Sequence, residues 1–425
     1  MIAVAFALAL QAVTPDTLPL ITLEEALRRG TQLDPSYVVA LGQVRDASWQ
    51  RTAALAAFVA PAVTATTGAS WFSSEIFNIG TGQPSSKIVS AQLSASYDLF
   101  RGGGKLFDLQ RRRAEFASAE ASEVEARFRT ALFIESDFYD VLAQQELVRV
   151  AEERVRRAGE QLGVARARVL TGGAVQTDSL QLVLELNRAR VDLLRQRSQL
   201  RVARLQLGRR VGSPTPVGAA PVGPTPPAAL PITEEDAVAE ALGEGPAALA
   251  ARADARAASA AVRSAWSLYL PSVTLTGQVS AFDVSFFPNA TTRSSVGFTI
   301  ALPIWNNGQR EIALSRARSA RAVAEATRRD TELAVRRDVV EAYEAYRTAR
   351  ASFDLAEEAV TVARENLRVQ DERYRAGATT ILDLVIAQVD LAAAEADLVQ
   401  ARYATRLALA GMEALLGRRL TMEGQ

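Results

Sequence analysis

The chain has 425 residues, with 48 basic and 48 acidic side chains, so its formal net charge is zero. This balance argues against a general nucleic-acid-binding protein, which would carry a basic excess. The sequence contains no cysteine and no histidine. Their absence removes disulfides, a lipid-modified N-terminal cysteine, Ser-His-Asp triads, and zinc or haem sites built on those ligands. An enzyme would be left with carboxylate, hydroxyl or lysine chemistry.

The first residues, Met1 to Ala12, form an apolar run that ends in the turn-like Val13-Thr14-Pro15-Asp16. This order is typical of the apolar core and cleavage site of a secretory signal, and we interpret residues 1–18 as a signal peptide and N-terminal segment. The alternative is a short buried segment, because the first cation is Arg28 and a positive leader is missing. No run reaches the roughly 18 apolar residues of a membrane-spanning helix, so strands would have to make any integral contact with a membrane.

An internal repeat organises the chain. The segment from Ile21 to Ala26 returns as Ile232 to Ala237, and farther on the matches settle at an offset of 205 residues. The pairs at this offset include Gly172 with Gly377, Asp178 with Asp383, Leu186 with Leu391, and Asp192 with Asp397. The sequence therefore predicts a first repeat over 19–211, a Pro/Gly-rich linker without packed structure over 212–231, a second repeat over 232–420 and a short tail over 421–425.

Each repeat begins with a helical stretch, Pro35–Ala60 or Pro246–Leu270, which ends at Pro61 or Pro271 because proline lacks an amide donor and clashes with the preceding turn. Two segments of period two follow, and they are typical of strands with one apolar and one small polar face. The predicted strands cover about 62–72, 87–99, 272–285 and 293–303, with polar loops over 73–86 and 288–293 between the members of each pair.

After the strands, glycine-containing turns at Gly103 and Gly308 lead into two long helices, about Lys105–Leu170 and Gln309–Arg375. Neither helix contains proline, and each would be roughly 100 Å long. An apolar stripe from Val339 to Leu367 has the 4-3 spacing of a coiled coil and returns in the first repeat. Each long helix stops at a glycine and a second helix follows, over 174–208 or 378–417, so each repeat ends in a helical hairpin with glycine at its tip.

The four strands allow two interpretations. They match bilayer-spanning strands with lipid on one side and water on the other, notably through the apolar residues Trp71, Leu93, Tyr97, Val279 and Phe298. Four strands cannot close a barrel, and open edges are not tolerated in lipid, so several copies would have to contribute, and three would give twelve strands. The alternative is a small antiparallel sheet packed on the helices of a soluble protein, which shows the same alternation.

Taken together, these features resemble the TolC-like outer-membrane efflux protein family over nearly the whole chain, from about Ile21 to Leu420. The motif that carries the resemblance is Tyr374-Arg375-Ala376-Gly377, followed by Asp383 and by a helix that ends in Leu415-Leu416-Gly417. A weaker partner motif is Val169-Leu170-Thr171-Gly172 with Asp178. The segments Leu99 to Gly103 and Pro303 to Gly308 look like the strand-to-helix junctions of the family.

The resemblance implies a mainly helical fold with a small β part: two tandem repeats that form a long α-helical coiled-coil barrel and a trans-membrane β-barrel of four strands per protomer, twelve in a homotrimer. It places the protein in the cell outer membrane, with the helices extending into the periplasm. It further implies a passive exit duct of a tripartite efflux or secretion system, opened by a periplasmic adaptor protein and an inner-membrane transporter. Beyond these partners and the outer-membrane lipid, we expect no cofactor, no metal, no nucleic acid and no catalytic residues.

The resemblance also assigns roles to residues of the hairpins. It implies that Gly172 and Gly377 contact the adaptor, that Asp383 lies near the constriction of the periplasmic gate, and that Tyr374 and Asp178 hold neighbouring hairpins together in the closed state. Two positions depart from the pattern of the family. A second constriction aspartate would fall at Ile386, and a linking arginine would fall at Thr379.

Simpler explanations exist for each of these residues. Asp178 and Asp383 fit the N-terminal turn of a helix, where the helix dipole favours a negative charge, and the two glycines fit helix caps without a partner. For the whole chain, the alternative function is a soluble periplasmic coiled-coil scaffold or adaptor protein. An enzyme is not expected, since the sequence has no phosphate-binding loop, nucleophile elbow or metal-ligand cluster. The sequence does not specify the exported substrate.

Overall fold

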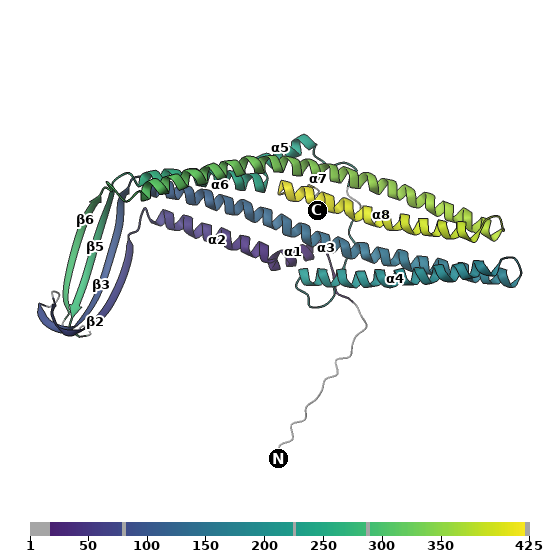
Figure 1. Cartoon of the computed structure of the whole chain (residues 1–425), viewed down its shortest axis with the longest axis horizontal. Coiled ribbons are helices and arrows are strands. Elements are labelled where there is room, and N and C mark those ends of the chain that lie inside the picture. The colour runs from purple at the N-terminus through teal and green to yellow at the C-terminus, as the bar shows by residue number, and fades with distance from the viewer. Residues whose placement is uncertain (1–17, 79–81, 224–226, 286–289, 421–425) are drawn as a thin grey trace, which may run out of the picture. The chain divides into compact units, whose positions relative to one another are not determined.

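The structure of the chain is a computed structural model that describes residues 18–78, 82–223, 227–285 and 290–420 (Figure 1). The expected signal segment, except for Leu18, and the expected tail lie outside the described residues. Helices make up most of the described chain, and strands form a smaller part. Among the described residues, no helix combines the length and the apolarity that a membrane crossing requires.

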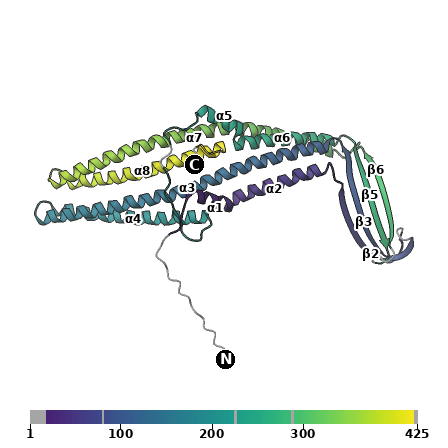
Figure 2. The ribbon, with the colours of Figure 1, turned by 180° about the vertical axis from the view of Figure 1, so that it is seen from behind.

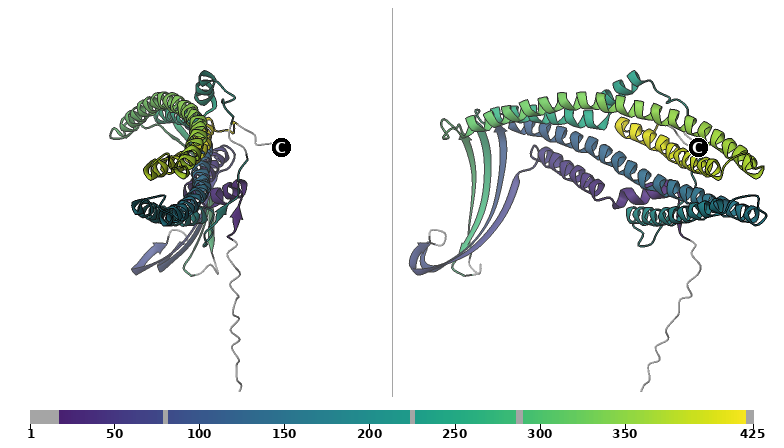
Figure 3. Two further views of the ribbon diagram at one scale, coloured as in Figure 1. Left: turned by 90° about the vertical axis from the view of Figure 1, so that its right-hand side faces the viewer. Right: turned by 45° about the vertical axis from the view of Figure 1, so that its right-hand side comes forward.

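The helices follow the same order in both repeats, as predicted. Those before the strands are α1 (Leu23–Leu33), α2 (Pro35–Ala56), α5 (Glu234–Glu244) and α6 (Pro246–Ser267). Those after the strands are α3 (Gly104–Leu170), α4 (Gln176–Arg210), α7 (Gln309–Arg375) and α8 (Ile381–Leu416). The predicted bounds of the long helices are confirmed to within one residue at each end. In each repeat the second helix folds back along the end of the long one, α4 along α3 and α8 along α7 (Figures 2 and 3).

The four long strands form one antiparallel sheet in the order β2-β3-β5-β6 (Figure 1). Their bounds are β2 (Ala62–Asn78), β3 (Gln83–Arg101), β5 (Ser272–Asp283) and β6 (Thr291–Ala301). The first pair is longer than predicted, and the loop expected over 73–86 is wrong for most of its length. Ladder pairing continues past the alternating segment, with Ile76 opposite Ser85, after a register shift that follows Trp71.

The register of the sheet aligns the apolar faces of the four strands. Leu93 lies opposite Ala65 on β2 and Val279 on β5, while Leu275 lies opposite Tyr97 on β3 and Phe298 on β6. Because successive side chains of a strand point to opposite faces, these residues share one face, and the intervening threonines and serines share the other. The two edge strands β2 and β6 have no strand partner on their outer sides among the described residues.

A short parallel sheet corrects the interpretation of the linker. Strand β4 (Gly218–Ala219) pairs with β1 (Leu20–Ile21), and Val217 and Ala219 are buried in the same apolar cluster as Ile21. The segment 212–231 is therefore not free of packed structure. The Pro- and Gly-rich composition of this segment predicted an extended chain. Its pairing with β1 could not be predicted, because the paired residues are about 200 positions apart and the sequence near them carries no pattern that indicates the pairing.

The chain divides into two compact units, and each unit draws on both repeats. The first comprises Met1–Val39, Glu125–Ala241 and Arg336–Gln425, and the second comprises Ala40–Val124 and Leu242–Val335. The first unit contains both hairpins and the β1–β4 pair, while the second contains the four-stranded sheet with α2 and α6. The two repeats are thus halves of the sequence, whereas each compact unit contains segments of both repeats.

The predicted strand-helix junctions have equivalent backbones in the two repeats. Pro61 and Pro271 stand directly before β2 and β5. At the other end of each strand pair, Gly102 and Gly103 have φ values of +56° and +76°, and Asn307 and Gly308 repeat the same two values. These left-handed conformations turn the chain from the strand into the long helix, as expected for Gly103 and Gly308.

Candidate functional site at the hairpin tips

The two hairpin tips have the same backbone geometry. Gly172 and Gly377 each have a φ of +75°, which favours glycine. The following amides, of Gly173 and Ala378, each donate to the carbonyl five residues earlier at 2.8 Å. This bond closes the last turn of the long helix in a Schellman motif, as predicted from the glycines alone. A Cβ atom at Gly172 would meet nothing within 4 Å, so the backbone conformation, and not crowding, requires glycine there.

Tyr374 lies between the two hairpins, three residues before its tip glycine. Its side chain is 3% exposed and belongs to an apolar cluster that joins residues of both hairpins, including Leu182 on α4 and Leu384 on α8. Its position continues the coiled-coil stripe, because every seventh residue of α7 from Val339 through Phe353 to Tyr374 is buried. Its hydroxyl oxygen is buried and has no hydrogen-bond partner among the described residues.

Arg168, near the end of α3, connects the two hairpins. One guanidinium nitrogen donates to the backbone carbonyl of Tyr374, and another donates to the carbonyl of Gly173 at 2.9 Å. The guanidinium carbon also lies 4.9 Å from the centroid of the Tyr374 ring, a cation–π arrangement. Arg168 thus holds the tip of its own hairpin and the last turn of the other.

Sequence reasoning missed Arg168, although a signal was present. Its counterpart at the 205-residue offset is Arg373, so an arginine stands four residues before the tip glycine in both repeats. Arg373 donates to the carbonyl of Ala378 at 3.4 Å, which matches the bond from Arg168 to Gly173. The repeated arginine could have been recognised as part of the tip. Its contact with the other hairpin had no local signal.

Asp178 is brought together with Tyr374, as the resemblance implied. Both residues line an open pocket of about 460 Å³ between the hairpins, together with Arg168, Gly377 and Thr380. Burial raises the pKa of the Tyr374 phenol above its ordinary value, and the charge of Asp178 raises it further. Asp178 lies in the first turn of α4, where a carboxylate also favours the helix. The arrangement joins the carboxylate of Asp178, the guanidinium of Arg168 and the buried ring of Tyr374 at the contact of the two hairpins.

Asp383 occupies a different environment, at the exposed start of α8. Thr380 and Asp383 form a capping box, in which the Thr380 hydroxyl accepts from the Asp383 amide at 3.3 Å and the Asp383 carboxylate accepts from the Thr380 amide at 3.2 Å. The carboxylate also accepts from the hydroxyls of Thr380 and Thr379, at 2.7 and 2.8 Å. These bonds, with that from the Thr380 hydroxyl the largest, lower the pKa of Asp383. Asp383 therefore does stabilise the start of a helix, as the simpler explanation expected. Its place at a constriction stays a prediction.

The two departures from the pattern of the family also have local explanations. Thr379, which stands in place of a linking arginine, donates to Asp383 and so supports the capping box. Ile386, which stands in place of a second acid, is 49% exposed. Among the described residues, no group of three or more Asp or Glu side chains could hold a metal ion.

Comparison with known proteins decides the family. The outer membrane efflux protein family matches residues 29–213 and 237–418, which covers most of both repeats. The chain belongs to the outer membrane efflux protein family. It is accordingly a protein of the outer membrane that extends into the periplasm, and an efflux channel is the class of function that this membership supports. Curated protein sequences give no match.

Solved channel structures share the fold of this efflux protein. VceC of Vibrio cholerae has a TM-score of 0.74 at 20% identity, over 94% of this chain and 97% of that one. The CmeC channel of Campylobacter jejuni has a TM-score of 0.78 at 14% identity, over 95% and 87% of the two chains. The MtrE channel of Neisseria gonorrhoeae, in its open state, has a TM-score of 0.76 at 19% identity, over 94% and 89%. The predicted class, mainly helical with a small β part in two TolC-like repeats, is confirmed.

Proposed function

We propose that this efflux protein is the passive exit duct of a tripartite efflux or secretion system and acts as a homotrimer. The observation that supports the proposal best is the open four-stranded sheet, in a chain that belongs to a family of outer-membrane channels. One face of the sheet is mostly apolar, with Thr67, Thr292 and Ser294 among its polar residues. On β6, Val296, Phe298 and Ile300 are all at least 60% exposed.

The open edges of the sheet favour assembly with further copies. In lipid, each unpaired backbone amide or carbonyl costs several kcal/mol, so β2 and β6 require strand partners. A second copy offers them, since β6 of one chain can pair with β2 of the next, and three copies would close a barrel of twelve strands. The apolar face would then contact lipid, and the threonines and serines of the other face would line a water-filled interior.

The hairpin tips are proposed to form the gate. Arg168 and Tyr374 hold the two hairpins of one chain together through contacts that a partner at the tips could replace. A periplasmic adaptor that binds Gly172 and Gly377, together with an inner-membrane transporter, would shift the equilibrium from closed to open by its stronger binding to the open state. No catalytic step is proposed, and the specificity for the exported molecule would lie with the transporter.

The first experiment tests the assembly. The full-length chain is expressed in a diderm host, outer membranes are isolated, and unheated and boiled samples are compared by gel electrophoresis with mass detection. We expect an outer-membrane species of about three protomers that collapses to one on boiling, because closed barrels resist detergent until heated. A soluble periplasmic monomer would refute the duct and support the coiled-coil scaffold.

A second experiment tests the contact with the adaptor. Gly172→Ala and Gly377→Ala strain a left-handed backbone at the tips, whereas Gly159→Ala and Gly163→Ala change helical positions of α3 at which a Cβ meets nothing within 4 Å. We expect the tip variants to reduce capture of a periplasmic adaptor protein, and the helix variants to retain it. Equal capture by all four would exclude the tips as the binding site.

A further inference from the structure

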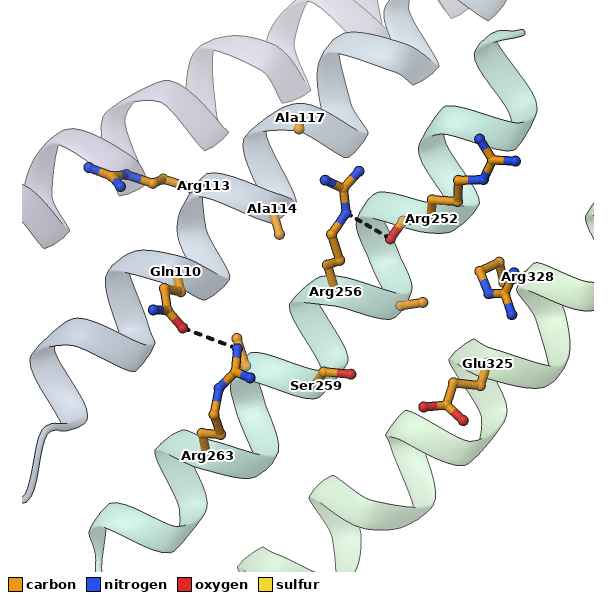
Figure 4. A pocket seen from close by; sticks show the side chains of 12 residues that line it. Gln110, Arg113, Ala114, Ala117, Arg252, Arg256, Ser259, Arg263, Glu325 and Arg328 are labelled. Carbon is orange, nitrogen blue, oxygen red and sulfur yellow. Dashed lines mark hydrogen bonds between the residues drawn. The ribbon is translucent and has the colours of Figure 1, made fainter. Parts of the chain in front are cut away.

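The second compact unit contains a groove whose walls are rich in arginine. It lies between α3, α6 and α7 and encloses about 1010 Å³ (Figure 4). Five arginines and a single acidic residue, Glu325, line this arginine groove, although the chain as a whole is electrically neutral. The arginines are Arg113, Arg252, Arg256, Arg263 and Arg328. Such a concentration of one charge costs free energy unless something of opposite charge occupies the groove.

Ion pairs within the unit satisfy only part of this charge. Arg252 and Arg328 share one carboxylate, that of Glu332, at 3.2 and 2.9 Å. Glu325 already pairs with Arg321 of its own helix at 2.7 Å. Glu325 and the nearby Glu332, which does not line the groove, are therefore both engaged by neighbouring arginines.

Among the residues that the structure describes, two arginines of α6 have only neutral partners. Arg256 donates to the backbone carbonyl of Arg252 at 3.3 Å, and Arg263 donates to the side-chain oxygen of Gln110 at 3.1 Å (Figure 4). Both side chains are exposed. Between the arginines, the walls consist of small residues, Ala114, Ala117, Ala255, Ser259 and Ala260, which leave space where an acidic side chain could otherwise have stood.

The corresponding helix of the first repeat lacks this arrangement. On α2, Arg51 covers the ring of Phe116 at 4.3 Å. On the α3 surface that faces α2, Arg112 pairs with Glu115 at 2.9 Å. On the side of α2, one arginine is covered by a ring and another is paired with a carboxylate, whereas on α6 Arg263 lies farther from a ring, 5.9 Å from the centroid of Phe107, and has no ion pair with a described residue. The open, partly uncompensated groove is specific to the side of α6.

The spacing of the arginines indicates the size of a ligand. Arg252 and Arg256 are one turn apart on α6, or about 6 Å along the axis, and Arg263 lies two turns farther, or about 10 Å. A single phosphate would reach one or two of them, since a guanidinium binds an oxyanion at hydrogen-bond distance. A molecule with several anionic groups along its length would reach more.

The same spacing argues against a lipid headgroup. Arg263 lies four residues before the end of α6, but Arg252 lies fifteen residues before it, or about 22 Å from that end of the helix. The headgroup layer of a bilayer is only about 5–8 Å thick. If the sheet spans the membrane, Arg252 and Arg256 lie in the aqueous space beyond the headgroups.

We propose that the arginine groove binds a soluble polyanion that carries two or more phosphate or carboxylate groups. Arg256 and Arg263 supply the charged donors that have no acidic partner, and Arg252 and Arg328 extend the positive wall on the side of α7. The groove forms within one chain, so this binding depends neither on the gate nor on the adaptor.

The test measures binding of inorganic tripolyphosphate to the purified full-length protein in a neutral detergent by isothermal titration calorimetry, with orthophosphate as a comparison. The variant is Arg256→Gln with Arg263→Gln. Its matched control is Arg45→Gln with Arg316→Gln, which removes the same charge at exposed positions of the same unit outside the groove. None of these four arginines forms an ion pair with a described residue, so all variants should fold, which circular dichroism checks.

We expect tripolyphosphate to bind more tightly than orthophosphate and to lose at least ~10-fold in affinity in the groove variant, because two charge-assisted hydrogen bonds are removed. The control should stay within about twofold of the wild type, since distant exposed charges are screened by salt. Equal losses in both variants, or no binding to the wild type, would overturn the proposal. Groove-dependent binding to phosphatidylglycerol vesicles without binding to tripolyphosphate would overturn it in favour of a headgroup.

Discussion

The guanidinium of Arg168 covers the ring of Tyr374 and hydrogen-bonds the Tyr374 carbonyl, although the two residues are 206 positions apart in the chain. One side chain thereby joins the last turn of α7 to the tip of the other hairpin. The resemblance assigned a linking role to an arginine at the position of Thr379, which is on α8's side of the tip. In this chain an arginine of α3 makes this link at the tips, and Arg157 and Arg402 add ion pairs between α3 and α8 farther from the tips, at 3.2 and 2.9 Å.

Replacing Arg168 should loosen the gate. Arg168→Ala removes a charge-assisted hydrogen bond, which contributes about 1.5–3 kcal/mol, and a cation–π contact. We expect the open probability in single-channel recordings to rise by ~10-fold or more. Arg166→Ala, at an exposed position of the same helix turn, should leave it unchanged. A closed Arg168→Ala channel would show that other contacts carry the closure.

Removing the Tyr374 hydroxyl should have little effect, in contrast to removing its ring. The hydroxyl is buried without a partner among the described residues, so Tyr374→Phe removes no hydrogen bond within the chain. Tyr374→Ala leaves a cavity in the cluster between the hairpins and should cost about 3–5 kcal/mol. The unfolding temperature and the closed fraction of the channel should be similar in the wild type and in Tyr374→Phe, and lower in Tyr374→Ala. A Phe variant that opens like the Ala variant would indicate that the hydroxyl bonds a neighbouring copy.

The start of α8 should weaken in acid. Because hydrogen bonds from Thr380 and Thr379 lower the folded-state pKa of Asp383 below its ordinary 3.8, the carboxylate stabilises the helix start above that pH. This contribution is lost as the pH falls through the lowered value. Thr380→Ala removes the N-cap, costs about 1 kcal/mol, and should reduce the pH dependence. Hydrogen exchange of the backbone amides in the first turn of α8, between pH 3 and 6, measures the loss of stability in acid for the wild type and for Thr380→Ala. The same pH dependence in both proteins would contradict the prediction.

One strand provides a matched test of the membrane-facing side. Phe298 and Thr299 are neighbours on β6 and point to opposite faces of the sheet. Phe298→Arg places a charge on the apolar face and should cost about 2–4 kcal/mol if that face meets the middle of the bilayer. We expect its yield in the outer membrane to fall sharply while Thr299→Arg assembles normally. The reverse result would mean that the polar face contacts lipid.

Much of the fold could be predicted because its signals are local. Glycine marked the ends of the long helices, and the heptad stripe marked the buried seam that Tyr374 continues. The helices before the strands end earlier than the prolines indicated, α2 at Ala56 and α6 at Ser267. The placement of Asp383 in the first turn of a helix was also expected, and the structure adds its capping box with Thr380. Each of these features depends on residues within one or two turns of one another.

The features that escaped prediction depend on distant partners. The burial of Ala219 follows from its pairing with Ile21, and the role of Arg168 follows from the packing of one hairpin on the other. The arginine groove likewise brings together α3, α6 and α7. No signal in the sequence indicated that these arginines converge, because they come from three helices far apart in the chain.

The turns before α3 and α7 have the same backbone conformation but accept different side chains. Gly102 and Asn307 have the same φ of 56°, so the backbone alone would accept asparagine at both positions. At Gly102, however, a Cβ atom would stand 2.5 Å from the carbonyl oxygen of Ser267, on the neighbouring helix α6. Side-chain tolerance at equivalent points of the two halves therefore differs because their neighbouring residues differ. An engineered chain built from two identical second halves would place Asn against that carbonyl and would have to move one helix to fold.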